Sequence, residues 1–154
     1  MPIFNRSYVG MGAETPQGSL QREGARLNVE INPTKETTAA LLKEGKALPQ
    51  PIIGMALIDT GASVTAIDKD TLEKSFNIQP VGISEVATPA GKISQNIYPI
   101  SLSFPGTELP NFAPVFVVAC ELNTQGIVAL IGRDILSHCL LVFNGKGAII
   151  SISI

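Results

Sequence analysis

The chain has 154 residues, a formal net charge of -2 at pH 7, and charged side chains at only 16% of its positions. This length fits one domain with a real core, and the small net charge gives no reason to expect nucleic acid or an anionic membrane as a partner. No apolar run is long enough to span a bilayer. The scarcity of charge therefore indicates extensive apolar burial, with room for a subunit interface.

Residues 1–24 are rich in glycine, proline and polar types and show no sustained periodicity. They are predicted to form an extended arm or flexible tail, either a simple tether or a strand that swaps onto a partner. The N-terminus lacks the continuous apolar core of a secretory signal, so a cytoplasmic location is expected. Residues 25–154 are predicted to form a single domain.

The first regular elements follow this arm. Leu27, Val29 and Ile31 alternate with polar residues, which predicts a half-buried strand that ends at 32–33. An apolar cluster among charged residues predicts a short helix over 34–46, with Thr34 as its N-cap. The prolines at 49 and 51 then favour an extended link.

The rest of the chain is dominated by β-type patterns. Strands are predicted over 54–58, 64–67, 81–87, 92–104, 113–119, 127–131, 140–143 and 150–154, with short helical segments over 68–76 and 133–138. Turns are predicted over 88–91 and at 144–145. The fold class is therefore all-β with one or two short helices, for which closed barrels and sandwiches are the natural architectures.

One short motif carries the chemistry. Asp59-Thr60-Gly61-Ala62-Ser63 directly follows an apolar strand, and this places one carboxylate on a glycine turn. Hydrolysis by an aspartic pair needs two carboxylates a few Å apart that share one proton. The motif occurs once, so a second copy of the chain must supply the other aspartate.

Several other residues could be catalytic by residue type, but each has a simpler structural interpretation. Asp134 is predicted to be a helix-start acid or an ion-pair partner, His138 a helix-end residue, and Asp68 and Asp70 solvated turn or helix-start acids. The two cysteines match no metal-ligand spacing. They are interpreted as small buried thiols, with a disulfide as the alternative. No metal or cofactor is expected.

The motif and a second one downstream together resemble the retropepsin-like aspartic proteases, the family of retroviral proteases and their cellular and bacterial relatives. The resemblance rests on Leu57-Ile58-Asp59-Thr60-Gly61-Ala62 and on Leu130-Ile131-Gly132-Arg133, and it covers about residues 25–145. It implies a closed retropepsin-like β-barrel that is active as a homodimer. A hairpin called the flap lies between the two motifs in that family.

The resemblance also implies roles for individual residues. Asp59 would be the catalytic aspartate, Thr60 would brace the opposite loop across the two-fold axis, and the carbonyl of Gly61 would receive the substrate backbone. Residues 86–97 would form the flap, and Gly132 and Arg133, with Ser63, would support the catalytic loop. Candidate substrate-binding residues are Ala62, Ala87, Thr88, Pro89, Ala90, Gly91, Ile93 and Ile135.

Some features depart from the viral pattern. Ser63 stands where viral enzymes carry an acidic residue, residues 34–50 look like an insertion, and the flap tip has Pro89 and one glycine. The pairing element of the dimer is expected to be either the strand that contains Ile150 and Ile152 or the N-terminal arm.

The sequence thus predicts an aspartic endopeptidase that acts on extended peptides or proteins. A non-catalytic module of the same fold that binds peptides or organises assembly is one alternative. A stable monomer that is inactive until it pairs is another.

Overall fold

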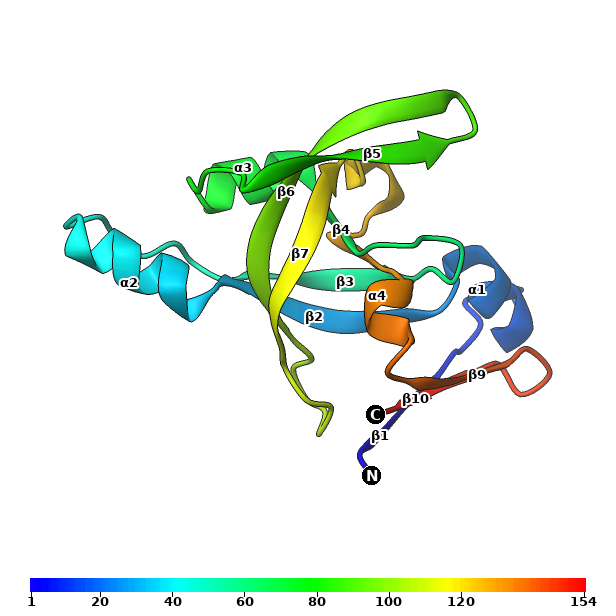
Figure 1. Ribbon diagram of the computed structural model, residues 1–154. Coiled ribbons are helices and arrows are strands. Elements are labelled where there is room, and N and C mark those ends of the chain that lie inside the picture. Colours follow the sequence, from blue (N-terminus) through cyan, green and yellow to red (C-terminus); the bar gives the residue numbers. More distant parts are fainter.

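The computed structural model describes residues 1–154 as a β-rich molecule with four α-helices (Figure 1). The strands are β1 (Ile3–Ser7), β2 (Arg26–Pro33), β3 (Ile52–Ile58), β4 (Ala66–Asp68), β5 (Gly82–Thr88), β6 (Gly91–Ser103), β7 (Phe112–Cys120), β8 (Ala129–Ile131), β9 (Leu140–Asn144) and β10 (Ile149–Ser153). The helices are α1 (Pro16–Glu23), α2 (Lys35–Lys43), α3 (Lys69–Ser75) and α4 (Arg133–Leu136), and a 3-10 turn η1 spans Asn123–Gln125.

Seven strands form the larger sheet, in the order β2-β3-β8-β4-β7-β6-β5. β3 pairs in parallel with β8, and β4 lies antiparallel to β8 and parallel to β7. The far end of β2 also pairs with β6, through Glu30↔Ser103 to Pro33↔Ile100. This extra pairing is the kind that a closed barrel requires, and the barrel itself stays a prediction.

The remaining three strands form a separate small sheet in the order β1-β10-β9. β10 pairs antiparallel with β1 on one edge and with β9 on the other. Ile150 and Ile152 point into the core and are almost fully buried. Because both edges of β10 are occupied, the strand that contains Ile150 and Ile152 cannot pair directly with a partner chain. The expectation that it does so is wrong.

The structure has four helices where one or two were expected. α2 begins as predicted: the Thr34 hydroxyl accepts a hydrogen bond from the Thr37 N–H, which satisfies one of the free donors of the first turn. α1 was not predicted. Thr15 caps it by accepting from the Gly18 N–H, and Pro16 occupies its first position, where a missing donor costs nothing.

Residues 1–24 fold onto the body of the protein instead of forming a flexible tail. Tyr8 and Leu20 are buried in the main core. The Tyr8 hydroxyl donates to the Gly24 carbonyl oxygen and accepts from the Arg26 N–H, which ties this segment to β2. The glycines and polar residues hid this element because only a few of its side chains reach the core.

One apolar core joins the two sheets. It contains 26 buried residues, including Val29 and Ile31 of β2, Ile100 and Leu102 of β6, and Ile150 of β10. Burial of these branched side chains is the main favourable term in folding. No helix in the structure has both the length and the apolar character that a membrane crossing requires.

Asp68 is a buried acid at the start of α3. It was expected to be a solvated helix-start acid, and the helix start is confirmed but the solvation is wrong, since only 2% of the residue is exposed. Its Oδ2 accepts from the Thr71 N–H and hydroxyl, and its Oδ1 accepts from the Leu122 N–H. Burial alone raises the pKa of Asp68, but these hydrogen bonds outweigh it and hold the pKa below its ordinary value.

We expect Asp68→Ala to lower the free energy of unfolding at pH 7 by about 2–3 kcal/mol, because it removes the cap and leaves the buried Leu122 N–H without a partner. The folded-state pKa is depressed, so this difference is fully present above the ordinary Asp value of about 3.9 and is lost as the pH falls through the lower folded value. Urea unfolding of both proteins at several pH values measures it.

Asp70→Ala is the matched control. Asp70 lies in the first turn of the same helix, is exposed, and pairs loosely with Lys74 at 3.4 Å. We expect a change within about 0.5 kcal/mol. Equal losses for the two variants would contradict the role given to Asp68.

Candidate active site

The Asp59 turn begins where β3 ends. The Asp59 N–H donates to the Ile131 carbonyl oxygen at 3.0 Å, which continues the parallel pairing of β3 with β8. The Ala62 N–H then donates back to the Asp59 carbonyl oxygen at 3.2 Å and closes a tight turn. The Asp59 Oδ1 atom accepts from the Gly61 N–H at 2.8 Å. Strand pairing and turn together fix the direction of this half-buried carboxylate.

Glycine at position 61 is explained by contact, and not by an unusual backbone conformation. The φ angle of Gly61 is not positive. A Cβ on residue 61 would lie 3.0 Å from Asp59 Oδ1, closer than ordinary van der Waals contact. A side chain at residue 61 would therefore push the carboxylate away from the N–H that holds it.

Arg133, the first residue of α4, is hydrogen-bonded to this turn. Its guanidinium Nη1 atom donates to the Thr60 carbonyl oxygen at 2.7 Å, and its backbone N–H donates to the Ala62 carbonyl oxygen at 2.9 Å. Two carbonyl groups of an exposed turn are thereby held from one residue at the start of α4. That Arg133 supports a catalytic loop, as the resemblance implies, stays a prediction.

Gly132 permits this close approach. A Cβ at residue 132 would lie 2.4 Å from the Val64 carbonyl carbon and 2.8 Å from the Thr65 nitrogen, both backbone atoms that cannot swing aside. Only a residue without a side chain lets α4 begin against the segment that follows the Asp59 turn.

A second set of hydrogen bonds, which was not predicted from the sequence, joins the segment after the Asp59 turn to the start of α4. Thr65 is fully buried, and its hydroxyl donates to Asp134 Oδ1 at 2.8 Å and accepts from the Gly132 N–H at 3.1 Å. The Thr65 N–H donates to Asp134 Oδ2 at 2.9 Å. Asp134 is therefore a helix-start acid, as predicted, whose partner is a threonine 69 residues away. No local pattern signals that pairing.

We expect Gly132→Ala to destabilise the protein by about 3 kcal/mol, because the new methyl group must displace the backbone at 64–65. Gly82→Ala is the control. The nearest atom to a Cβ at residue 82 is Ile97 Cδ1 at 3.8 Å, which is ordinary contact, so that variant should change stability by less than about 1 kcal/mol. Thermal and urea unfolding measure both, and similar values for the two would contradict this account.

The predicted hairpin over 81–104 is present as β5 and β6. The two strands pair from Gly82↔Ile97 to Thr88↔Gly91, and the Thr88 hydroxyl donates to the Gly91 carbonyl oxygen across the turn. Pro89 and Ala90 form the exposed tip. Figure 1 shows this tip and the loop from β3 to β4 on the same side of the molecule.

The register of this hairpin separates two residues that were expected to line one cleft. Ala87 pairs with Lys92, whereas Ile93 pairs with Val86. Side chains alternate between the faces of a strand and paired residues share a face, so Ala87 and Ile93 project from opposite faces. At most one of them can face Asp59. Val86, which the sequence reading did not single out, shares the face of Ile93.

The other expected site residues lie around the turn or within the core. Thr60 and Ser63 are exposed, and Ala62 is half-buried beside Arg133. Ile135 is 3% exposed and belongs to the main core, so its side chain mainly packs α4 against the protein. His138 follows α4, is exposed, and stacks at a tilt on Phe112 with 6.4 Å between ring centres.

Neither cysteine forms a disulfide, and both are half-buried. Burial raises the pKa of the Cys120 thiol, with a smaller contribution from Asp68, and burial also raises the pKa of Cys139. A raised pKa keeps a thiol protonated at neutral pH, which is the opposite of what a cysteine nucleophile needs. The thiols therefore offer no competing catalytic chemistry.

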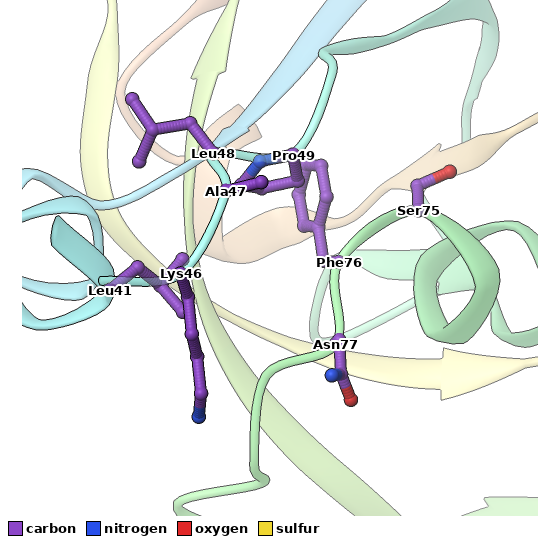
Figure 2. Close-up of a pocket in the computed structure, with 8 residues that line it drawn as sticks. All are labelled: Leu41, Lys46, Ala47, Leu48, Pro49, Ser75, Phe76 and Asn77. Atoms are coloured by element: carbon purple, nitrogen blue, oxygen red, sulfur yellow. The ribbon is translucent and has the colours of Figure 1, made fainter. Parts of the chain in front are cut away.

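Asp59 does not line either of two hollows on the surface of the molecule. The first, of about 390 Å³, lies between the end of α2, the following link and the end of α3, as Figure 2 shows with Leu41, Leu48 and Phe76. The second, of about 500 Å³, lies between β7 and α4 and includes Val64 and His138. Asp59 is half-buried at the turn, and its Oδ2 atom has no hydrogen-bond partner within the chain.

Comparisons with known proteins found similar solved structures, one of which is described below. No family model matches the chain, and no curated protein matches it. A solved structure, the solution structure of Simian Foamy Virus (mac) protease, is similar with 18% sequence identity and a TM-score of 0.44. The match covers 73% of this chain and 92% of that chain.

Proposed function

We propose that the protein is an aspartic endopeptidase whose active site forms between two copies of the chain, each of which supplies Asp59. The observation that carries this proposal is the Asp59 turn. Its single carboxylate accepts a hydrogen bond from the Gly61 N–H, and Arg133 donates to the Thr60 carbonyl oxygen of the same turn. Such a carboxylate is rigidly aimed but has no acidic partner in its own chain. A two-fold axis beside it would supply the partner.

The chemistry follows from two carboxylates at short distance. Like charges that close cannot both ionise cheaply, so the pair shares one proton. The ionised member activates a water molecule, and the protonated member polarises the peptide carbonyl oxygen. The proton then passes to the leaving amine as the peptide bond breaks. Such a pair loses its two protons in two steps, and the pKa of each step belongs to the pair and not to either residue.

The other site residues have roles that follow from their places. The Thr60 hydroxyl lies on the exposed turn, where it can reach the partner's turn across the axis. The Gly61 carbonyl oxygen can accept from the substrate backbone. The β5–β6 hairpin would close over an extended peptide, exclude water and add strand-like hydrogen bonds through Thr88–Gly91.

One face of the hairpin is better suited to contact the substrate. Glu85 and Lys92 form an ion pair at 3.5 Å on the face that carries Ile83 and Ala87, and both charged side chains are more than two-thirds exposed. A solvated ion pair belongs on the outer face. The opposite face carries Val86 and Ile93 without any charged residue, next to the polar Ser84, Thr88 and Gln95, and we assign Val86 and Ile93 to bulky apolar substrate groups. Ala87 then lies outside the cleft.

The first test is cleavage of a peptide library by wild type and Asp59→Asn from pH 4 to 7. Loss of the ionisable pair should lower kcat/KM by about 10³-fold or more. Asp70→Asn, which alters an exposed carboxylate far from the turn, is the control and should cleave like wild type. Mass spectrometry of the products reports the cut sites.

Two results would count against the proposal. Cleavage that survives Asp59→Asn would assign the chemistry to another residue. A wild-type pH–rate profile that is flat from acid to neutral would contradict a pair that shares one proton.

The assignment of hairpin faces has its own test. Ile93→Ala should lower kcat/KM about tenfold for substrates with bulky apolar groups, because it removes apolar contact in the closed complex. Ile83→Ala, on the outer face of the same hairpin, should leave kcat/KM unchanged. Steady-state kinetics decides, and the reverse order of effects would place Ala87, not Ile93, in the cleft.

A further inference from the structure

The face of the larger sheet that carries Asp59 also carries a positive charge. Ile58 is buried in the core, and the Asp59 N–H continues the pairing of β3 with β8. Side chains alternate along a strand, so Leu57 and Asp59 both project from the face opposite to Ile58. Arg26 of β2 pairs with Leu57, and paired residues share a face. Arg26, Leu57 and Asp59 therefore lie on one face of the sheet.

The guanidinium group of Arg26 is held in place but keeps free donors. Its Nε–H donates to the Glu23 carbonyl oxygen at 2.7 Å, which fixes the direction of the half-buried side chain. Neither Nη atom has a hydrogen-bond acceptor within the chain, and no carboxylate forms an ion pair with Arg26. The end of the side chain is thus an oriented cation without an anion.

The neighbouring arginines already have carboxylate partners. Arg6 pairs with Glu23 at 3.5 Å, and Arg22 pairs with Glu14 at 3.0 Å and with Glu23 at 3.2 Å. The three arginines around α1 thus outnumber the two glutamates by one positive charge. Arg26 is the arginine that has no carboxylate, so its charge is the one that remains available for a ligand.

The segment after α1 brings this charge close to the Asp59 turn. The Ile58 N–H donates to the Ala25 carbonyl oxygen at 2.8 Å, and Figure 1 shows α1 beside the loop from β3 to β4. A strand rises about 3.3 Å per residue and lies about 5 Å from its neighbour, so the Cα atoms of Arg26 and Asp59 are about 8 Å apart. An extended peptide that crosses Asp59 would therefore pass the guanidinium group about two to four residues from the scissile bond.

A carboxylate is the substrate group that suits this guanidinium. A peptide bound over Leu57 would cover part of the Arg26 side chain, and covering a charged group costs free energy unless an opposite charge compensates. Arginine binds a carboxylate through two parallel N–H···O hydrogen bonds. The two Nη atoms of Arg26 can form both bonds while its Nε–H stays on the Glu23 carbonyl oxygen.

We propose that Arg26 selects peptides that carry an aspartate or glutamate side chain about two to four residues from the scissile bond. This inference rests on the proposed function, because it assigns a substrate preference to the Asp59 site. Each copy of the chain contributes one Arg26, so a two-fold axis gives the cleft one cation on each side of the scissile bond. Peptides with an acidic residue on both sides are the preferred substrates.

Matched peptides test this preference. A peptide that wild type cleaves is made with glutamate or glutamine at each position within about four residues of the cut. Its ends are blocked, so the side chain supplies the added carboxylate. At the best position, wild type should show a kcat/KM about five- to tenfold higher for the glutamate peptide. Arg26→Gln should bring this ratio to about one, and Arg26→Glu should favour lysine at the same position.

Two controls separate charge recognition from folding. Lys35→Gln removes an exposed lysine at the start of α2 and should keep the wild-type ratio. The ratio compares two substrates of one enzyme, so a change in the folded fraction leaves it unaltered. Fluorescence anisotropy with Asp59→Asn measures binding of the same peptides without cleavage, and the glutamate peptide should again be favoured about five- to tenfold.

The outcomes distinguish the preference from the chemistry. A wild type that cleaves both peptides equally, or an Arg26→Gln variant that keeps the preference, would overturn the role of Arg26 and leave the protease in place. A wild type that cleaves no peptide but binds the glutamate peptide more tightly, through Arg26, would support this inference and contradict the proposed function. Equal binding of both peptides without cleavage would overturn both.

Discussion

The hydrogen bonds between the Asp59 turn and the start of α4 are the contact on which the site depends. Arg133 binds two carbonyl oxygens of the turn, and Thr65 and Asp134 lock the next segment to the same helix. Charge-assisted hydrogen bonds of this type are stronger than neutral ones. Residues 60, 61 and 63 of the turn are exposed, so these hydrogen bonds are what holds the turn to the start of α4.

Gly132 sets the distance at which these contacts form. Backbone atoms of residues 64–65 occupy the space that any side chain at residue 132 would need. The larger sheet also fixes the position of the turn, because β8 pairs with both β3 and β4, the strands that flank the turn.

The absence of an acidic partner for Asp59 in its own chain gives this arrangement its meaning. A carboxylate that is held in place but has a free Oδ2 atom lacks a catalytic partner in one molecule, and a two-fold axis beside it would supply one. The other candidate catalytic residues have different roles in the structure. Asp68 caps α3, and Asp134 accepts hydrogen bonds from Thr65. Burial raises the pKa of both cysteine thiols.

Local patterns in the sequence were enough to predict most strands, the Thr34 cap, the hairpin over 81–104 and the two motifs around Asp59 and Gly132. These features depend on alternation, capping and turn chemistry within a few residues. The fold of residues 1–24, the burial of Asp68 and the Thr65–Asp134 pair depend on residues far apart in the chain, so only the tertiary structure decided them. The same holds for the opposite faces of Ala87 and Ile93, because strand register fixes which side chains share a face.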